Sequence, residues 1–385
     1  MASPTILQGA QTAIGSTSGI QSAQRIIDME DEIFLLEPDA APLTVFTKAT
    51  KTGRTAFSPS FSWLEDVLAP KTLTLSSDGG STSLTLATGD GGKVATYDLV
   101  KNTSSGEIML VTAINTDTLT VTRAFGVTAQ ATGNANDALL IIGNANEENQ
   151  ASRTILATQT TKLTNYCQIF RTPFAFSRTL ENSDLYGGKY PAQQMRKKGI
   201  EHRTEMERQF LFGEPYEQTL TDGGRWQTGG IDYFIQSNRI DANKSVTYAG
   251  LEDALQLVFR YGNQKSRLGI AAPSFISKID LLAEARLFHQ TTTEQYGVSL
   301  TKVTSSHGTL LLVKHPLLQA IAAYNERCYM LDMDAIAERP FQGADTKLRM
   351  NIQSPDVDGK KHEYLTQIGL EVRNERKHAV MYNCA

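Results

Sequence analysis

The chain has few cysteines, and they form no recognisable pattern. Only 3 occur in 385 residues, and Cys167, Cys328 and Cys384 lie far apart in the sequence. An odd number of widely spaced cysteines argues against a disulfide framework and against a zinc knuckle. We therefore expect buried or incidental thiols at these positions.

Long apolar runs, a secretion signal and an excess of basic residues are also missing. No stretch approaches the 18 apolar residues of a membrane-spanning helix, and the opening MASPTILQGAQT has neither a basic start nor an apolar core. These features predict a protein made and folded in a cytosol, without a membrane partner. The net charge of -4 argues against tight capture of nucleic acid, although it allows loose contact with DNA.

Segments that resemble ligand-binding loops are incomplete. The sequence GDGGK at 89–93 lacks the first glycine of a phosphate loop, where Thr88 stands, and Val94 replaces the required Ser or Thr. Residues 354–359 half-match a calcium loop, but Leu365 stands where the bidentate Glu belongs, so a hairpin turn is the better interpretation. Acidic residues are scattered, and no paired-carboxylate site can be picked out. We expect no metal and no cofactor.

Two histidines are the best candidates for catalysis, and their context is poor. His307 and His315 are accompanied by neither a GxSxG elbow nor an HExxH helix. We interpret them as a turn histidine and a strand-end histidine and expect no catalytic site. A hydrolase that uses one of them remains an alternative.

What the chain does contain begins with its size and a threonine-rich β segment. At 385 residues with 40% apolar residues, the chain is long enough for two or three domains with real cores. In residues 106–126, Leu119 and Val121 alternate with threonines after the turn residues Asn115-Thr116-Asp117, which predicts a hairpin. About six such strands predict a small sandwich or barrel over 67–147. By itself, this segment also fits a carbohydrate-binding module.

Extended patterns flank the β segment on both sides. Residues 1–19 have little to bury and predict an arm that is ordered only against a partner, and 26–36 predict one or two helical turns. Aromatic residues then punctuate an extended pattern over 44–63, and a similar pattern returns over 153–176. We interpret the two patterns as the outgoing and returning strands of one long hairpin that carries the β segment.

One long charged helix follows. Pro191 suits its first turn and Gly213 ends it, so the prediction is a helix over 191–212. Its narrow apolar stripe contains Met195, Gly199, His202, Met206 and Phe210. The charged residues are assigned to solvated faces or to another subunit: Arg196, Lys197, Lys198, Glu201, Arg203, Glu205, Glu207 and Arg208. A glycine-rich loop around Arg225 and Trp226 is predicted over 220–230.

The last part of the chain has an α+β pattern. Thr247 can cap a helix that ends before Gly262, and a second helix is predicted over 274–288. The predicted strands are 268–271, 298–303, 309–313, 328–331, 347–352, 363–372 and 379–382, with a hairpin between the second and third.

This order of parts resembles the major capsid proteins of tailed bacteriophages with the Hong Kong 97-type fold. The segments EIMLVTAINTDTLTVTRAFGVTA, SSHGTLLLVKHPLL and CYMLDMDAI carry the local similarity. The resemblance implies an α+β fold divided as follows: 1–43, N-terminal arm; 44–66 and 148–180, extended loop; 67–147, all-β insertion domain; 181–247 and 340–385, peripheral domain with the spine helix 191–212; 248–339, axial domain.

The resemblance also implies a function and a set of partners. Copies of the chain would self-assemble into hexamers and pentamers, forming an icosahedral shell around packaged double-stranded DNA. The protein would reside in the capsid shell of the virion and assemble in the host bacterial cytoplasm, with a portal and decoration proteins as further partners. No long charged segment precedes the arm, which implies a separate scaffolding protein. A tail protein or another virion component is the main alternative.

We predict subunit-interface residues on the extended loop, the spine helix and the glycine-rich loop. They are Arg54, Phe57, Phe61, Trp63, Arg196, Lys197, Arg203, Arg208, Arg225 and Trp226.

Overall fold

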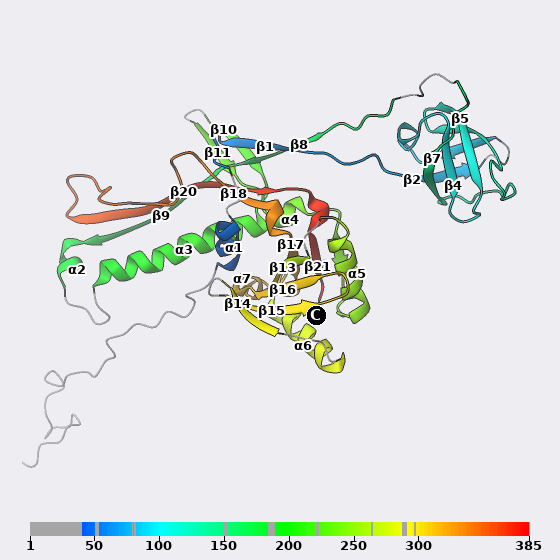
Figure 1. Cartoon of the computed structure of the whole chain (residues 1–385). Helices are drawn as coiled ribbons and strands as arrows, with labels where there is room; N and C mark the ends of the chain where they lie inside the picture. The colour runs from blue at the N-terminus through cyan, green and yellow to red at the C-terminus, as the bar shows by residue number, and fades with distance from the viewer. Residues whose placement is uncertain are drawn as a thin grey trace, which may run out of the picture. The chain divides into compact units, whose positions relative to one another are not determined.

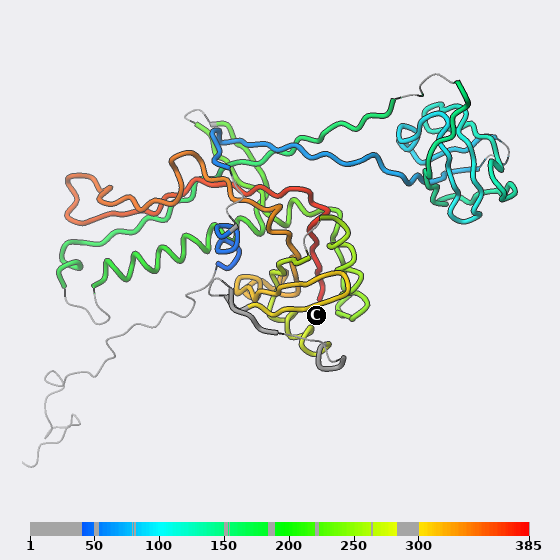
Figure 2. Tube along the Cα trace, in the orientation of Figure 1, coloured from blue at the N-terminus to red at the C-terminus, as the bar shows by residue number. Residues whose placement is uncertain are grey.

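The chain contains two compact units, traced in Figures 1 and 2. The computed structural model describes residues 41–50, 54–78, 80, 82–149, 153, 155–183, 189–220, 223–262, 265–286, 291–295 and 298–384. One unit comprises Trp63–Leu163, and the other comprises the remainder of the chain. The predictions of an arm over 1–19 and of helical turns over 26–36 lie outside the described residues.

The smaller unit is a closed barrel. Its strands are β2 (Thr72–Asp78), β3 (Ser83–Leu86), β4 (Asp98–Asn102), β5 (Ile108–Asn115), β6 (Thr118–Thr122) and β7 (Ala138–Asn144), in the order β2-β3-β6-β5-β4-β7. Alternate side chains point inward and fill the core, which includes Leu73, Leu75, Leu84, Leu86, Val100, Met109, Val111, Leu119, Val121 and Leu139. The β5–β6 hairpin confirms the prediction for 106–126. Of the two predicted architectures, the barrel forms.

The glycine-rich segment at 89–93 is a structural turn of this barrel. A short 3₁₀ turn covers Gly91–Lys93, and Asp117 Oδ1 accepts hydrogen bonds from the amides of Gly89 and Gly91 at 3.0 and 3.1 Å. A Cβ atom at Gly91 would lie 1.8 Å from the carbonyl oxygen of Thr116, so only glycine allows this approach.

The larger unit is built around a seven-stranded mixed sheet. Its order is β12 (Arg239–Asp241), β21 (Ala379–Tyr382), β17 (Cys328–Leu331), β13 (Ser266–Ala271), β16 (Thr309–Lys314), β15 (Val298–Thr304) and β14 (Thr291–Gln295). The pairs β12–β21 and β13–β16 are parallel and the others are antiparallel. The predicted hairpin between 298–303 and 309–313 is confirmed.

Both faces of this sheet are covered. On one face, Cys328 and Met330 pack with residues of α5 (Tyr248–Phe259) and α6 (Pro273–Arg286). On the other face, Tyr329 and Leu331 pack in a second core with residues of α1 (Pro42–Thr50) and α3 (Tyr190–Phe212). All four side chains of β17 are therefore buried, as a strand covered on both faces requires.

The predicted helices are present. Thr247 Oγ1 caps α5 by accepting the amide of Gly250 at 3.1 Å, as predicted. The helix predicted over 274–288 forms as α6, and its last two predicted residues lie outside the described residues. Pro191 stands in the first turn of α3. Short helices occur at α2 (Arg178–Asn182), α4 (Ile231–Phe234) and α7 (Pro316–Ala320).

A second sheet lies alongside α3. It contains β18 (Ile336–Pro340), β20 (Gly359–Val372) and β19 (Lys347–Arg349), and β9 (Gln168–Ser177) pairs with β20 in ten registered positions. The turn predicted at 354–359 precedes β20 and belongs to the β19–β20 connection. Figure 1 shows the long β9–β20 ribbon running along α3.

Three secondary-structure predictions require correction. Residues 42–50 form α1 and not an extended strand, because Leu43 and Phe46 fall on one helical face that enters the core. Among the described residues, the outgoing and returning strands pair only as β1 (Ser60–Glu65) with β8 (Thr161–Tyr166), since the chain from Gln168 onward pairs with β20 instead. The segment 220–230, predicted as a loop, contains the strand β11 (Gly223–Gln227), which forms a hairpin with β10 (Tyr216–Leu220).

Candidate functional sites: buried polar anchors and exposed surfaces

Glu207 is the centre of a buried polar anchor for α1. It lies on α3, is completely buried, and accepts the amide of Leu43 on Oε1 at 2.6 Å and that of Thr44 on Oε2 at 2.8 Å. These amides belong to the first turn of α1 and have no partner within the helix, so Glu207 satisfies them as a capping residue would. The positive end of the α1 dipole also favours a carboxylate there. The start of α1 is thus fixed to α3.

His315 completes this anchor. Its Nδ1 accepts the amide of Leu317 at 3.2 Å, which leaves the proton on Nε2, and Nε2 donates to Glu207 Oε1 at 2.9 Å. His315 directly follows β16 and caps α7. One carboxylate therefore joins three elements, α1, α3 and the β16–α7 junction. The prediction that His315 is a strand-end histidine is confirmed, and its ring is fully buried in a structural contact.

A second carboxylate lies against α1. Glu338 on β18 is in hydrogen-bond contact with the hydroxyl of Thr47. Burial raises the pKa of Glu338 to about 7, while Thr47 and Lys48 oppose the shift. The β18 side of α1 therefore contains a carboxyl group that titrates near neutral pH.

His202 fixes α3 to the β9–β20 sheet. Its Nδ1 lies 2.8 Å from Thr172 Oγ1 and its Nε2 lies 2.8 Å from Thr366 Oγ1, and the ring is buried. Burial, with a smaller effect from Lys48, lowers the pKa of His202 to about 4. The ring is neutral near pH 7 and bridges two strands through threonine hydroxyls. Next to it, the hydroxyl of Tyr364 donates to the carbonyl of Met195 at 3.1 Å.

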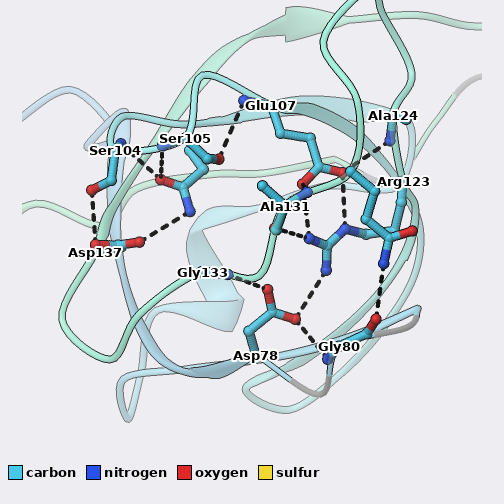
Figure 3. A network of polar contacts seen from close by, with 12 residues as sticks. Asp78, Gly80, Ser104, Ser105, Glu107, Arg123, Ala124, Ala131, Gly133 and Asp137 are labelled. Carbon is cyan, nitrogen blue, oxygen red and sulfur yellow. Dashed lines mark hydrogen bonds and ion pairs between the residues drawn. The ribbon is translucent and has the colours of Figure 1, made fainter.

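A network around Arg123 fastens the long loop of the barrel, as Figure 3 shows. Arg123 Nε and Nη2 donate to the two oxygens of Glu107 at 2.9 and 2.8 Å, and Nη1 donates to Asp78 Oδ1 at 2.9 Å. The carboxylates also accept backbone amides, Glu107 from Ala131 at 3.1 Å and Asp78 from Gly133 at 2.6 Å.

The Arg123 network is almost completely buried, with side-chain exposures of 6% or less for its three charged residues. Hydrogen bonds and the charge of Arg123 outweigh burial and lower the pKa values of Asp78 and Glu107. A charge here without its partner would be costly. The network therefore holds β2, the β4–β5 turn and the loop after β6 in one arrangement.

The predicted interface residues of the extended loop fall into two groups. Arg54 and Phe57 are exposed, with 77% of Phe57 accessible. Phe61 and Trp63 are buried. Phe61 lies beneath the guanidinium of Arg339, 5.7 Å from its ring centroid. Their burial within the chain leaves almost no free side-chain surface at these two positions.

The predicted interface residues of α3 are all exposed. Arg196, Lys197, Arg203 and Arg208 lie outside the buried faces of the helix, and none of their side chains has an ion pair or hydrogen bond with another described residue. On the β10–β11 hairpin, Arg225 is exposed, while Trp226 is half-buried and donates from Nε1 to Glu217 Oε1 at 3.3 Å. As an interface, these positions stay predictions.

The sequence assignment of Glu207 to a solvated face of α3 was wrong. The C-terminal half of α3 is buried over a wider arc than the predicted stripe, because α1 covers a second side. A signal was available in Phe210 and Leu211, which follow Glu207 by three and four residues and so share its face. That signal could place Glu207 on an apolar face but could not identify α1 as its partner.

The sequence also predicts neither metal binding nor membrane insertion. In the described part of the chain, no group of three or more His, Cys, Asp or Glu side chains could hold a metal ion. No helix within the described ranges is long and apolar enough to cross a membrane. The three cysteines are buried and unpaired, as predicted.

The sequence matches a known protein family over nearly its whole length. The family model described as SU10 major capsid protein matches residues 9–385. The chain belongs to the SU10 major capsid protein family. This result confirms the predicted resemblance to phage major capsid proteins and gives the chain a structural role in a virion capsid. The matched family is one of major capsid proteins and not of tail proteins, the main alternative.

Individual relatives of this SU10-family chain are distant in sequence. The major capsid protein of Pseudomonas phage PaMx41 is 26% identical over 297 residues, which cover 73% of this chain and 70% of that protein. Two solved structures are similar. The capsid of cyanophage P-SCSP1u is 11% identical, covers 96% of each chain and has a TM-score of 0.49. The capsid of Myoviridae phage XM1 is 10% identical, covers 94% of this chain and 99% of that chain and has a TM-score of 0.45.

Proposed function

We propose that this chain is the repeating shell subunit of an icosahedral phage head with the Hong Kong 97-type arrangement. Hexamers and pentamers of the chain form the shell, which encloses packaged double-stranded DNA. The observation that carries the proposal is the match of a major capsid family model to nearly the whole chain.

Exposed apolar side chains support subunit contact. On the segments that lead into and out of the barrel, Leu68 is 91% and Ile155 is 87% accessible, and Leu64 and Val67 are each more than half exposed. Complete burial of one such apolar side chain at an interface would contribute about 1.5 to 3 kcal/mol of favourable free energy. Four such residues on extended chain are what an intersubunit contact would use.

In this proposal, each predicted domain makes a particular set of contacts between subunits. The extended loop (44–66 and 148–180) lies over a neighbouring subunit, with Arg54 and Phe57 as its exposed interface residues, and the arm (1–43) reaches towards another. The spine helix contributes Arg196, Lys197, Arg203 and Arg208, and the hairpin of the peripheral domain contributes Arg225 and Trp226. The axial domain (248–339) forms the contacts around the hexamer and pentamer axes, and the insertion domain (67–147) is displayed on the loop.

Further partners belong to the same proposal. A separate scaffolding protein directs assembly in the host bacterial cytoplasm, a portal occupies one vertex, and decoration proteins bind the shell. Packaged DNA is contacted loosely, because a net charge of -4 does not produce a strongly attractive field for phosphate.

Electron microscopy of the purified or co-expressed chain tests the proposal. Uniform closed shells are expected, and a chain that remains monomeric under all assembly conditions would contradict it. Substituting Leu68→Asp together with Ile155→Asp should abolish shells, since both exposed apolar contacts would be replaced by charges.

The matched control is Gln159→Asp together with Thr160→Asp, which adds the same two charges at exposed polar positions of the segment that contains Ile155. Circular dichroism should show an unchanged fold in all variants, because none of these side chains is buried. Shells that form normally from the double variant would remove these apolar residues from the interface.

A further inference from the structure

Three basic side chains form an unpaired row along α3. Lys189 stands at its N-terminal cap, Arg196 and Arg203 follow at intervals of seven residues, and all three are exposed. Seven residues of an α-helix bring a side chain back to within about 20° of its starting direction. None of the three side chains has an ion pair or hydrogen bond with another described residue. The basic row is therefore one face of like charge.

Arg203, at one end of the basic row, lies about one helical turn from Glu207, the residue that anchors α1. Glu207 follows Arg203 by four residues, about 40° around α3, and its carboxylate holds the amides of Leu43 and Thr44. The first described residue, Ala41, is only two residues from this contact, and its carbonyl accepts the hydroxyl of Thr44 at 3.1 Å. The chain that precedes α1 thus joins the subunit at the Arg203 end of the row.

The sequence just before Ala41 is strongly acidic. Residues 28–39, DMEDEIFLLEPD, contain no basic residue and six acidic ones: Asp28, Glu30, Asp31, Glu32, Glu37 and Asp39. Twelve extended residues can span about 40 Å, and the row from Lys189 to Arg203 is about 21 Å long. The length of the acidic segment and its charge both match the row.

We propose that residues 28–39 bind the basic row of α3 in the same chain. Carboxylates of the segment pair with Arg203, Arg196 and Lys189, and the contact sets the direction in which residues 1–27 leave the subunit. The contact lies within one chain, so it does not depend on the proposed shell assembly.

Carbodiimide coupling with mass spectrometry tests the contact, because it joins a carboxylate directly to a lysine amine. In the full chain, residues 28–39 should couple to Lys189, and in Arg196→Lys and Arg203→Lys variants they should also couple to the new lysines. Lys101, an exposed lysine of the barrel, is the control and should not couple to this segment. Absence of the α3 products would overturn the proposal.

An equal mixture of ¹⁵N-labelled and unlabelled chains separates same-chain from neighbour contacts. Products in which both peptides carry the same label are expected. Products with mixed labels in statistical proportion would overturn the same-chain contact.

Charge reversal provides a second test. A protease that cuts after glutamate should cleave the Glu32–Ile33 bond about tenfold faster in Arg196→Glu/Arg203→Glu than in the unchanged chain, as expected when two surface ion pairs become repulsive. Adding Asp28→Lys and Asp39→Lys to that variant should slow cleavage again. Arg208→Glu makes the same charge change about 140° around the helix from Arg203 and should have no effect.

DNA phosphate is the competing anion for this row. If Arg196→Glu/Arg203→Glu abolishes DNA binding while cleavage after Glu32 stays unchanged, the row binds nucleic acid and the proposal is overturned. Melting temperatures of all variants should match that of the unchanged chain, since every altered side chain of α3 is exposed.

Discussion

Glu207 Oε1 and the amide of Leu43 are joined by a hydrogen bond of 2.6 Å across 164 residues of sequence. The bond closes the first turn of α1 with a side chain from α3 and is completely buried. It connects the start of α1 to the long helix of the larger unit.

Glu207→Gln should destabilise the docking of α1. Glutamine offers one acceptor where the carboxylate offers two, and its NH₂ group would face the amide of Thr44 or Leu43. Loss of the charge-assisted bonds in a buried site should lower the free energy of unfolding by about 2 to 4 kcal/mol. Urea unfolding measures the loss, and hydrogen exchange at Leu43 and Thr44 should accelerate.

The control for Glu207→Gln is Glu205→Gln. Glu205 lies on the same helix, is exposed, and accepts only a 3.4 Å hydrogen bond from Thr172. It should change stability by less than about 0.5 kcal/mol. Equal effects of the two substitutions would show that the hydrogen bonds of Glu207 to α1 contribute no more to the free energy of unfolding than an exposed glutamate does.

Arg123→Met should loosen the barrel. The substitution leaves Glu107 and Asp78 buried without their counter-charge, a situation that typically costs about 3 to 5 kcal/mol. Hydrogen exchange should accelerate in the loop after β6, at Ala131 and Gly133, whose amides bind these carboxylates. Lys101→Met, at an exposed position of β4, should leave exchange unchanged. Unaltered protection in Arg123→Met would mean that apolar packing alone holds the loop.

Gly91→Ala and Gly92→Ala form a matched pair. A Cβ atom at Gly91 would lie 1.8 Å from Thr116 O, whereas one at Gly92 would meet nothing within 4 Å. Gly91→Ala should therefore force the turn away from the β5–β6 connection and lower the melting temperature by several degrees, while Gly92→Ala should be nearly neutral. Thermal unfolding of both variants decides whether this glycine is required by the barrel.

Stability should fall as the pH is lowered from about 6.5 to 4. Burial lowers the pKa of His202 and of His378 to about 4, below the ordinary histidine value of 6.5. Between these values the unfolded chain binds protons that the folded chain does not, so each histidine contributes stability above pH 6.5 that is lost towards pH 4. Each can contribute a slope of up to about 1.4 kcal/mol per pH unit.

Urea unfolding at several pH values measures this slope. His202→Gln should reduce it by about one proton while keeping hydrogen-bonding groups near Thr172 and Thr366. A slope that does not change in the variant would show that His202 titrates normally.

Glu338 should have the opposite pH dependence. Its folded pKa of about 7 lies above the ordinary glutamate value of 4.5, so its contribution to stability is complete below pH 4.5 and is lost as the pH rises through 7. Glu338→Gln removes this loss and should stabilise the chain at pH 8 by about 1 to 3 kcal/mol. The gain should disappear near pH 4.5. A variant that is less stable at pH 8 would show that the ionised carboxylate is required by α1.

Much of the local structure could be predicted from the sequence because it depends on neighbouring residues. Threonine and leucine alternation predicted the β5–β6 hairpin, and Thr247 marked the start of α5. Errors occurred where distant segments compete for a strand or cover a helix. The strand after Gln168 has an extended pattern, but pattern alone cannot show that β20 is its partner and β1 is not.

The sequence by itself determined the barrel pattern, the long helix, the α+β order and the family, since periodicity and segment order are properties of the chain alone. Only the tertiary structure decided that residues 42–50 are helical, that Glu207 is buried and that His315 is held by it. These outcomes depend on partners more than 100 residues away, whose contacts outweigh local preference once the core forms. The sequence around a helical glutamate is the same whether its carboxylate is hydrated or accepts the amides at the start of another helix.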